Sequence, residues 1–95
     1  MFLHTFVFRW NPDVDPAQIQ RAQAAIHNFQ GKIPGLLKVY AGENVAANRS
    51  GYDFGGVMIF TDKAALDAYQ THPLHQDLLA WLVPLIQAVE LDLEA

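Results

Sequence analysis

Residues 2–10, the stretch "FLHTFVFRW", are apolar on both of the faces that an extended chain presents. Aromatic and β-branched residues in such a run favour a strand. Because side chains alternate between the two faces, one face carries His4 and Phe6 and the other carries Leu3 and Val7. A strand that is apolar on both faces is stable only in a sheet that is covered on both sides. We therefore expect helices on one face of the sheet and a further layer on the other.

The remaining sequence alternates between helix and strand patterns. Asp15 before Pro16 is typical of a helix start, and Gly31 is expected to end that helix. Thr61 or Asp62 is expected to cap the helix that follows the third strand. The expected strands are residues 2–10, 37–45, 52–60 and 89–94, and the expected helices are residues 16–30, 64–71 and 74–83. This β-α-β-β-α-β order predicts an α+β, ferredoxin-like protomer, with one antiparallel four-stranded sheet and its helices on a single face.

Length and composition favour one globular domain over residues 1–95. A chain of 95 residues, 52% hydrophobic and 17% charged, can bury a modest core and is not typical of a disordered protein. The net charge of −4 argues against a nucleic-acid partner, and the absence of cysteine excludes disulfides and thiolate metal sites. Residues 1–10 are too short to span a membrane and lack the basic region of a signal peptide. We expect a cytoplasmic protein that binds no membrane.

Helices on a single face leave the other face of the sheet without cover. The first strand is apolar on that side too, and an exposed apolar face marks an interaction surface. A homodimer in which two sheets pack face to face, at a spacing of roughly 10 Å, would cover it. We therefore expect the chain to form a dimeric α/β barrel with a second copy of itself.

The stretch 68–76, "AYQTHPLHQ", places a tyrosine and two histidines around one proline. On a continuous helix Tyr69 and His75 would be about 240° apart. Because Pro73 breaks the helix, His75 can begin the next helix and turn back toward Tyr69. A helix N-terminus disfavours positive charge, so the imidazole would stay neutral and act as a base near pH 7. With Tyr69 as hydrogen-bond donor, the pair could remove a proton next to a carbonyl group.

Structural roles remain open for the same residues. Tyr69 could be a core residue with its hydroxyl at the rim, and His75 could be a structural histidine with satisfied hydrogen bonds. We expect His72 to lie at the solvent-facing end of the preceding helix, where an imidazolium suits the last carbonyl groups. Because Pro73 separates the two histidines and no carboxylate accompanies them, we predict neither a metal site nor a cofactor.

A ligand pocket between sheet and helices would be lined by the first strand. His4 lies among aromatic rings, and a buried polar ring without a hydrogen bond costs a few kcal/mol, so we expect it to line the pocket and orient a ligand. A glycine pair inside the third strand predicts a bulge or a close approach. Packing is the simpler role for Trp81. The candidate lining residues beside His4 are apolar or small: Phe6, Phe8, Gly56, Met58 and Trp81.

Four blocks of the sequence carry a family resemblance. They are "MFLHTFVFRWNPDV", "KIPGLLKVYAGENV", "GYDFGGVMIFTDKAALDAYQTHPLHQDLLAWLVPLI" and "AVELDLE", and together they span essentially the whole chain. In this order they resemble the stress-responsive A/B barrel family, also called Dabb for dimeric α/β barrel. The resemblance implies the ferredoxin-like protomer and the face-to-face dimer.

The resemblance also implies candidate chemistry. A plant member of the family cyclises a linear polyketide to olivetolic acid without metal or cofactor, using a tyrosine and a histidine that match Tyr69 and His75. A pocket histidine of that cyclase matches His4. This chain has Gly56 and Ile26 where the cyclase carries bulky residues, which predicts a differently shaped pocket.

Three functions follow as alternatives. The first is a Dabb homodimer that binds a small, mostly apolar molecule and performs cofactor-free lyase, cyclase or isomerase chemistry, with His75 as base and Tyr69 as donor. The second is a non-catalytic, stress-related dimer that binds a ligand or has a purely structural role. The third is a cofactor-free monooxygenase, because the wider dimeric α/β barrel fold also hosts such enzymes. Whether the chain is an enzyme stays open at this point.

Overall fold

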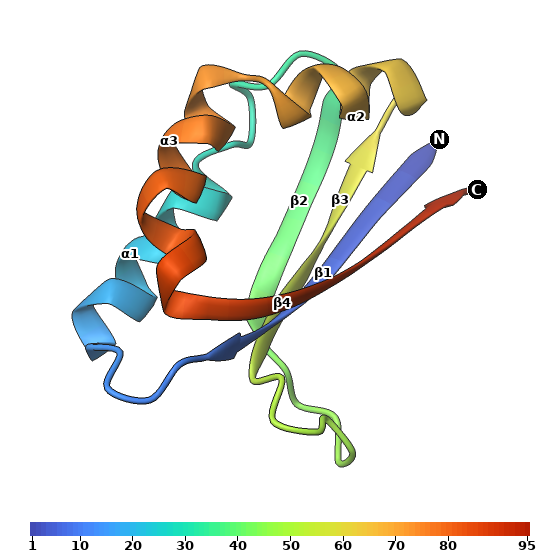
Figure 1. Ribbon diagram of the computed structural model, residues 1–95. Helices are drawn as coiled ribbons and strands as arrows, with labels where there is room; N and C mark the ends of the chain where they lie inside the picture. Colours follow the sequence, from blue (N-terminus) through green and yellow to red (C-terminus); the bar gives the residue numbers. More distant parts are fainter.

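The computed structural model describes residues 1–95 and has the expected order of elements (Figure 1). The four strands form one antiparallel sheet in the order β2-β3-β1-β4, which confirms the ferredoxin-like α+β fold. A single 3-10 turn at Val83–Leu85 joins the last helix to the last strand. The elements are β1 (Phe2–Trp10), α1 (Pro16–His27), β2 (Leu36–Glu43), β3 (Phe54–Phe60), α2 (Lys63–Gln70), α3 (Pro73–Leu82) and β4 (Ile86–Glu94).

The helix starts are fixed by the expected capping residues. The Asp15 carboxylate accepts a hydrogen bond from the Ala17 N–H at 2.8 Å, and the Gln18 side chain accepts one from the Asp15 N–H, which completes a capping box. Asp62 caps α2 by accepting from the Ala65 N–H at 2.8 Å. Both helices therefore begin next to the residues that the sequence indicates.

Several ends differ from the expected ranges by one to three residues, and β3 starts at Phe54 rather than at residue 52. Helix α1 stops at His27 rather than at residue 30, because residues 28–31 turn and end in Gly31 with a φ of +81°. Strand β2 stops at Glu43, because the loop toward β3 has already begun at Asn44, whose side chain donates to the Tyr52 carbonyl. Strand β4 starts at Ile86, not at 89, because β1 offers a pairing partner along its whole length.

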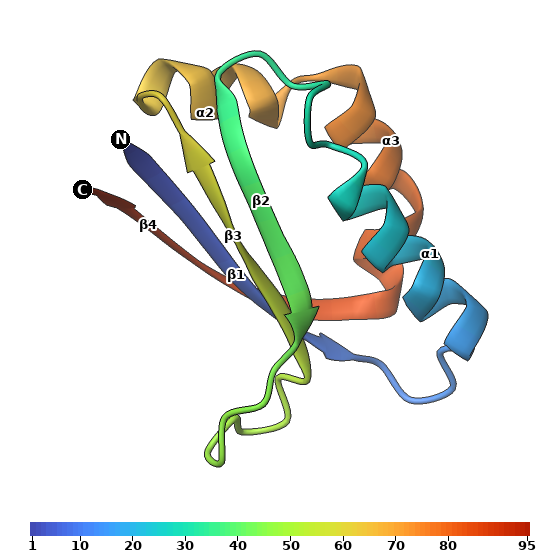
Figure 2. The same ribbon diagram turned by 180° about the vertical axis from the view of Figure 1, so that it is seen from behind.

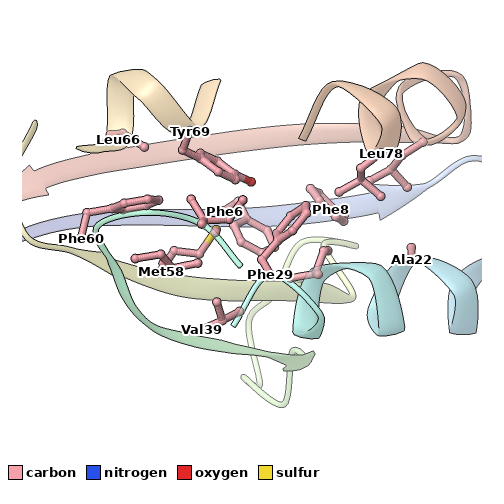
Figure 3. Close-up of a cluster of buried hydrophobic side chains, with 14 of the residues drawn as sticks. Phe6, Phe8, Ala22, Phe29, Val39, Met58, Phe60, Leu66, Tyr69 and Leu78 are labelled. Atoms are coloured by element: carbon pink, nitrogen blue, oxygen red, sulfur yellow. The ribbon is translucent and has the colours of Figure 1, made fainter. Parts of the chain in front are cut away.

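The helices cover one face of the sheet only. Figures 1 and 2 show α1 and α3 side by side over this face, while α2 lies across one end of the strands. A cluster of 15 buried hydrophobic residues fills the space between sheet and helices (Figure 3). Phe54, Met58 and Phe60 from β3 and Leu82 from α3 are its largest fully buried side chains. Burial of this cluster is the main contribution to folding stability.

The opposite face of the sheet, here called the outer face, is open and apolar. In the register of β1 with β4, His4 lies beside Asp92 and Phe6 beside Glu90, so these four residues share the helix-covered face. The alternate residues of β4 must then point to the outer face. The large hydrophobic side chains that remain exposed there include Tyr40, Val89, Leu91 and Leu93, with exposed fractions of 55%, 51%, 59% and 41%.

Candidate functional site

Tyr69 and His75 face each other across the break between α2 and α3. Their ring centroids lie 4.2 Å apart, at an interplanar angle of 39°. Helix α2 ends at Gln70, and α3 begins at Pro73, so the two rings project from different helices. The helix break that Pro73 predicts is present, and it brings the two side chains together.

A backbone carbonyl orients the His75 ring. Its Nδ1 lies 3.1 Å from the Gln70 carbonyl oxygen, and because a carbonyl only accepts, Nδ1 carries the proton. Nε2 of the neutral ring then keeps its lone pair. Burial lowers the pKa of His75 below its usual value; the Gln70 carbonyl and Glu90 oppose this shift, and His4 adds to it. The ring is therefore a neutral imidazole near pH 7, which can accept a proton at Nε2.

Tyr69 is a protonated donor in the same cluster. Its side chain is only 4% exposed, and Figure 3 shows it reaching from α2 toward the sheet, over Phe6. Burial, followed by the negative charge of Glu90, raises the pKa of Tyr69 far above its usual value. None of the side-chain hydrogen bonds in the structure uses its hydroxyl. The O–H group is thus free to donate to a ligand.

His4 joins the cluster from the sheet side. Its ring centroid lies 6.2 Å from that of Tyr69, and its Nδ1 lies 2.5 Å from an Asp92 carboxylate oxygen. Because the carboxylate accepts, Nδ1 of His4 donates, and the orientation of the ring is fixed. The ring is 4% exposed, so it has the hydrogen-bond partner that a buried polar ring requires.

Asp92 and Glu90 are members of the site that the residue pattern did not reveal. Both lie on β4, on the same face as His4, and Glu90 acts electrostatically on Tyr69 and His75. A signal was present: acids at alternate positions 90, 92 and 94 must share one face of a strand. Only the pairing of β1 with β4, 88 residues apart, shows that this face is the one that carries His4.

Of the expected lining residues, Phe6 lies beside the cluster, with its ring centroid 5.9 Å from that of His4. Phe8 and Met58 are core residues with exposed fractions of 8% and 1%. Gly56 lies beneath the Phe6 ring, where a Cβ atom would be 2.6 Å from Phe6 Cζ. The close approach expected at the glycine pair is present, whereas the bulge lies in β2, next to residue 37.

Trp81 and His72 lie elsewhere. Trp81 contacts α1, where the Arg21 guanidinium stacks on its ring at 3.9 Å from the centroid, so it is not part of the Tyr69–His75 cluster. The expectation that His72 lies at the C-terminal end of α2 is wrong. His72 is the N-cap of α3. Its Nδ1 accepts a hydrogen bond from the Leu74 N–H at 3.1 Å, which requires an unprotonated nitrogen and not an imidazolium.

The structure has two sizeable hollows, and both lie outside the Tyr69–His75 pair. One, of about 730 Å³, is lined on the outer face by Tyr40, Val57, Val89 and Leu91, and Phe6, Gly56 and Glu90 also line it. The other, of about 270 Å³, is a groove between α1 and α3. Tyr69 and His75 border neither; they are covered by core side chains. No group of three metal-ligating side chains occurs, and no helix has the length and apolar character needed to cross a membrane.

The fold and the site define a class of protein: a ferredoxin-like domain with a buried tyrosine–histidine pair under its helices. The sequence profile of the stress responsive A/B barrel domain (Dabb) matches residues 2–95. The chain therefore belongs to the Dabb family, as its sequence blocks predict. No curated protein sequence matches it.

Solved structures show the same fold. A dimeric ferredoxin-like protein of unknown function from Jannaschia sp. CCS1 is 31% identical, with all of both chains covered and a TM-score of 0.80. A second such protein, from Thermobifida fusca YX, is 28% identical over 99% of this chain and 90% of its own, with a TM-score of 0.86. A hydroxynitrile lyase from Passiflora edulis is 16% identical over 98% and 94% of the chains, with a TM-score of 0.79, which shows the fold alone.

Proposed function

We propose that this Dabb protein is a homodimer that binds a small, mostly apolar carbonyl compound between sheet and helices and removes a proton next to the carbonyl group. The observation that carries the proposal is the pairing of the Tyr69 and His75 rings, whose centroids lie 4.2 Å apart. The hydrogen bond from His75 Nδ1 to the Gln70 carbonyl leaves Nε2 of the same ring unprotonated. A base and a donor at this spacing suit enolisation, which requires no metal and no cofactor.

In the proposed step, His75 Nε2 takes a proton from the carbon next to the carbonyl group. The electron pair of the broken C–H bond moves to form the enolate, whose oxygen accepts a hydrogen bond from the Tyr69 hydroxyl. The proton then lies on an imidazolium that is stabilised by the Gln70 carbonyl at 3.1 Å and by the negative field of Glu90. Returning this proton to another carbon of the enolate completes an isomerisation. In a cyclisation the enolate carbon instead attacks a second carbonyl group of the same substrate, and the alkoxide that forms takes the proton. In a lyase reaction the enolate expels a leaving group from the neighbouring carbon, and the leaving group takes the proton.

His4 is proposed to orient the ligand. It is held by Asp92, and its ring centroid lies 5.9 Å from that of Phe6 and 6.2 Å from that of Tyr69, so a ligand that contacts it would lie beside these aromatic rings. The same fold carries a lyase in Passiflora edulis, which is consistent with this class of reaction but says nothing about the substrate of this chain.

Dimer formation through the outer face is the second part of the proposal. Its support is the row of exposed Val89, Leu91 and Leu93 on β4, and the dimeric state of the two bacterial proteins of the same fold. Packing two such faces at roughly 10 Å would bury them. Analytical ultracentrifugation at micromolar concentration tests this part, and a monomer would contradict it.

Hydrogen–deuterium exchange tests the chemical part. Phenylacetone, a small apolar ketone, is incubated with the protein in deuterated water, and exchange next to its carbonyl group is followed by NMR. We expect exchange above the buffer rate, with His75→Gln and Tyr69→Phe each lowering the enhancement about 100-fold. Tyr52→Phe, which changes a loop tyrosine stacked on Arg9, is the matched control and should leave the rate unchanged.

A non-catalytic role is favoured by one observation. Tyr69 and His4 are each only 4% exposed, so the chain's own side chains occupy much of the space that a ligand would need. A structural or ligand-binding dimer would show no exchange above buffer while its thermal midpoint still falls in the Tyr69→Ala variant. Exchange that is equal in wild type and His75→Gln would also leave only this role.

A further inference from the structure

The groove between α1 and α3 has the composition of a binding site for a small acid. Its floor is apolar and includes the buried side chains of Phe29 and Leu78, which are 3% and 6% exposed. Its rim carries Arg21, Lys32 and Asn28, with one carboxylate, Asp77, on the α3 side. At about 270 Å³ the groove lies near the small end of ligand clefts, which measure roughly 300–1,000 Å³.

The two cations of this rim lack carboxylate partners. No ion pair or side-chain hydrogen bond engages Arg21 or Lys32, even though the protein as a whole has a net charge of −4. Asp77 is nearby in the rim but lies beyond ion-pair distance of both. The two ion pairs made by lysine or arginine lie outside the groove, between Arg49 and Asp53 and between Lys63 and Asp67. A cationic rim on an acidic protein therefore favours an anionic ligand at this place.

Arg21 is held in place by Trp81. The guanidinium carbon lies 3.9 Å from the centroid of the indole ring, which is a cation–π contact. A stacked guanidinium loses less conformational freedom when it pairs with a planar carboxylate. The stack thus presents an ordered donor group at one end of an apolar floor.

We propose that this groove binds a small apolar carboxylate, with the carboxylate between Arg21 and Lys32 and the apolar body on Phe29 and Leu78. The site is distinct from the Tyr69–His75 pair and does not rest on the proposed chemistry. The two sites share one wall, because the other side of the Phe29 ring packs edge-on against Tyr69, with centroids 5.7 Å apart. Asp77 opposes the anion and limits its affinity.

Phenylacetate and phenylacetamide form a matched pair of probes, because they share a shape and differ in charge. Binding is measured by isothermal titration calorimetry and by the NMR shift of the Trp81 indole N–H, which is assigned with a Trp81→Phe variant. We expect phenylacetate to bind about tenfold more tightly than phenylacetamide, because charge-assisted hydrogen bonds are the stronger ones. Added salt should weaken only phenylacetate, since the rim is exposed to solvent.

Variants of the exposed rim should leave the fold intact. Arg21→Gln and Lys32→Gln are each expected to weaken phenylacetate binding about fivefold, and Asp77→Asn to tighten it by about twofold or more. Lys63→Gln removes the same charge from an ion pair on α2 and should leave the affinity for phenylacetate unchanged. A general loss of stability could weaken phenylacetate binding but could not tighten it. The tighter binding expected for Asp77→Asn therefore indicates a specific site.

Four results overturn the proposal. Three of them are equal affinity for the charged and the neutral probe, unchanged phenylacetate binding in Arg21→Gln, and shifts that fall on the His75 ring instead of on Trp81. The last result would place the acid at the proposed catalytic pair, so the two proposals can fail separately. Absence of any saturable shift at millimolar phenylacetate also overturns it.

Discussion

The rings of Tyr69 and His75 lie 4.2 Å apart although a helix end, a proline and a new helix start separate them along the chain. His72 makes this geometry possible, because it caps α3 with its side chain and lets Pro73 occupy the first helical turn. The 3.1 Å hydrogen bond from His75 Nδ1 to the Gln70 carbonyl then connects the start of α3 to the end of α2. A base and a donor are thus positioned by local backbone geometry and not by a long-range network.

The lowered pKa of His75 predicts a pH dependence of stability. In the unfolded chain the pKa of His75 is near the ordinary histidine value of 6.5, whereas in the folded protein it is lower. Between these two values the unfolded state binds more protons, so the free energy of unfolding falls as the pH drops through about 6.5. Urea denaturation at pH 7.5 and 5.0, at one protein concentration, should show a larger loss for wild type than for His75→Gln.

The NMR titration of the His75 ring supplies the control for this prediction. Its midpoint should lie below 6.5 in the wild type and move lower still in Glu90→Gln, because the Glu90 carboxylate favours the imidazolium. Parallel pH profiles for wild type and His75→Gln, or a midpoint at or above 6.5, would contradict the prediction.

The Tyr69 hydroxyl and the Tyr69 ring should have different effects on stability. The hydroxyl has no hydrogen bond within the protein, so Tyr69→Phe should change the free energy of unfolding by less than about 0.5 kcal/mol. The ring packs against Phe29 and Phe60 at 5.7 and 5.4 Å, so Tyr69→Ala should cost about 3–5 kcal/mol. Urea denaturation measures both. A large loss in Tyr69→Phe would mean that the hydroxyl is structural, which argues against its role as a free donor.

Much of the fold and the meeting of Tyr69 with His75 follow from local patterns, but the rest of the site does not. Apolar residues that recur every second residue predict the strands, and those that recur every three or four residues predict the helices. With Asp15, Pro16 and Pro73 as boundary signals, these patterns place every strand and α-helix to within a few residues. The boundary at Ile86 could not be predicted, because it depends on the length of the neighbouring strand β1. His72 before a proline fits a helix end as well as a helix start, and only the path of the backbone decides between them.

The partners of the candidate residues are non-local, and for that reason they were missed. Asp92 reaches His4 across a strand pair whose register is a tertiary property. Trp81 was a candidate for the pocket, but the direction in which α3 presents it depends on how the helix packs on α1, where it contacts Arg21. Residue type identifies candidates, whereas the register of the sheet and the packing of the helices decide which of them meet.

Gly56 should be intolerant of any side chain. A Cβ atom there would lie 2.6 Å from Phe6 Cζ and would also meet the Tyr40 carbonyl of the neighbouring strand. We expect Gly56→Ala to lower the free energy of unfolding by about 1–3 kcal/mol, as overpacking does. Gly42→Ala, on the edge strand β2, is the control, because a Cβ atom there meets nothing within 4 Å. It should be neutral or slightly stabilising, so equal losses in the two variants would exclude a packing effect.

The residue-level test of the proposed dimer is a single charge on the outer face. Leu91 is 59% exposed in one chain and pairs with Thr5 of β1, so Leu91→Lys should not affect the fold of the protomer. Between two packed sheets, however, the ammonium group would be buried without a partner, which costs several kcal/mol. We expect Leu91→Lys to sediment as a folded monomer at micromolar concentration.

Ala88→Lys is the matched control for Leu91→Lys, because it adds the same charge to the same strand on the opposite face. Ala88 pairs with Phe8, whose side chain faces the helices, and it is exposed at the edge of the sheet. Its variant should therefore stay dimeric. If both variants dissociate, general charge repulsion and not the outer face controls assembly. If Leu91→Lys stays dimeric, the interface lies elsewhere, and the apolar row on β4 needs another partner.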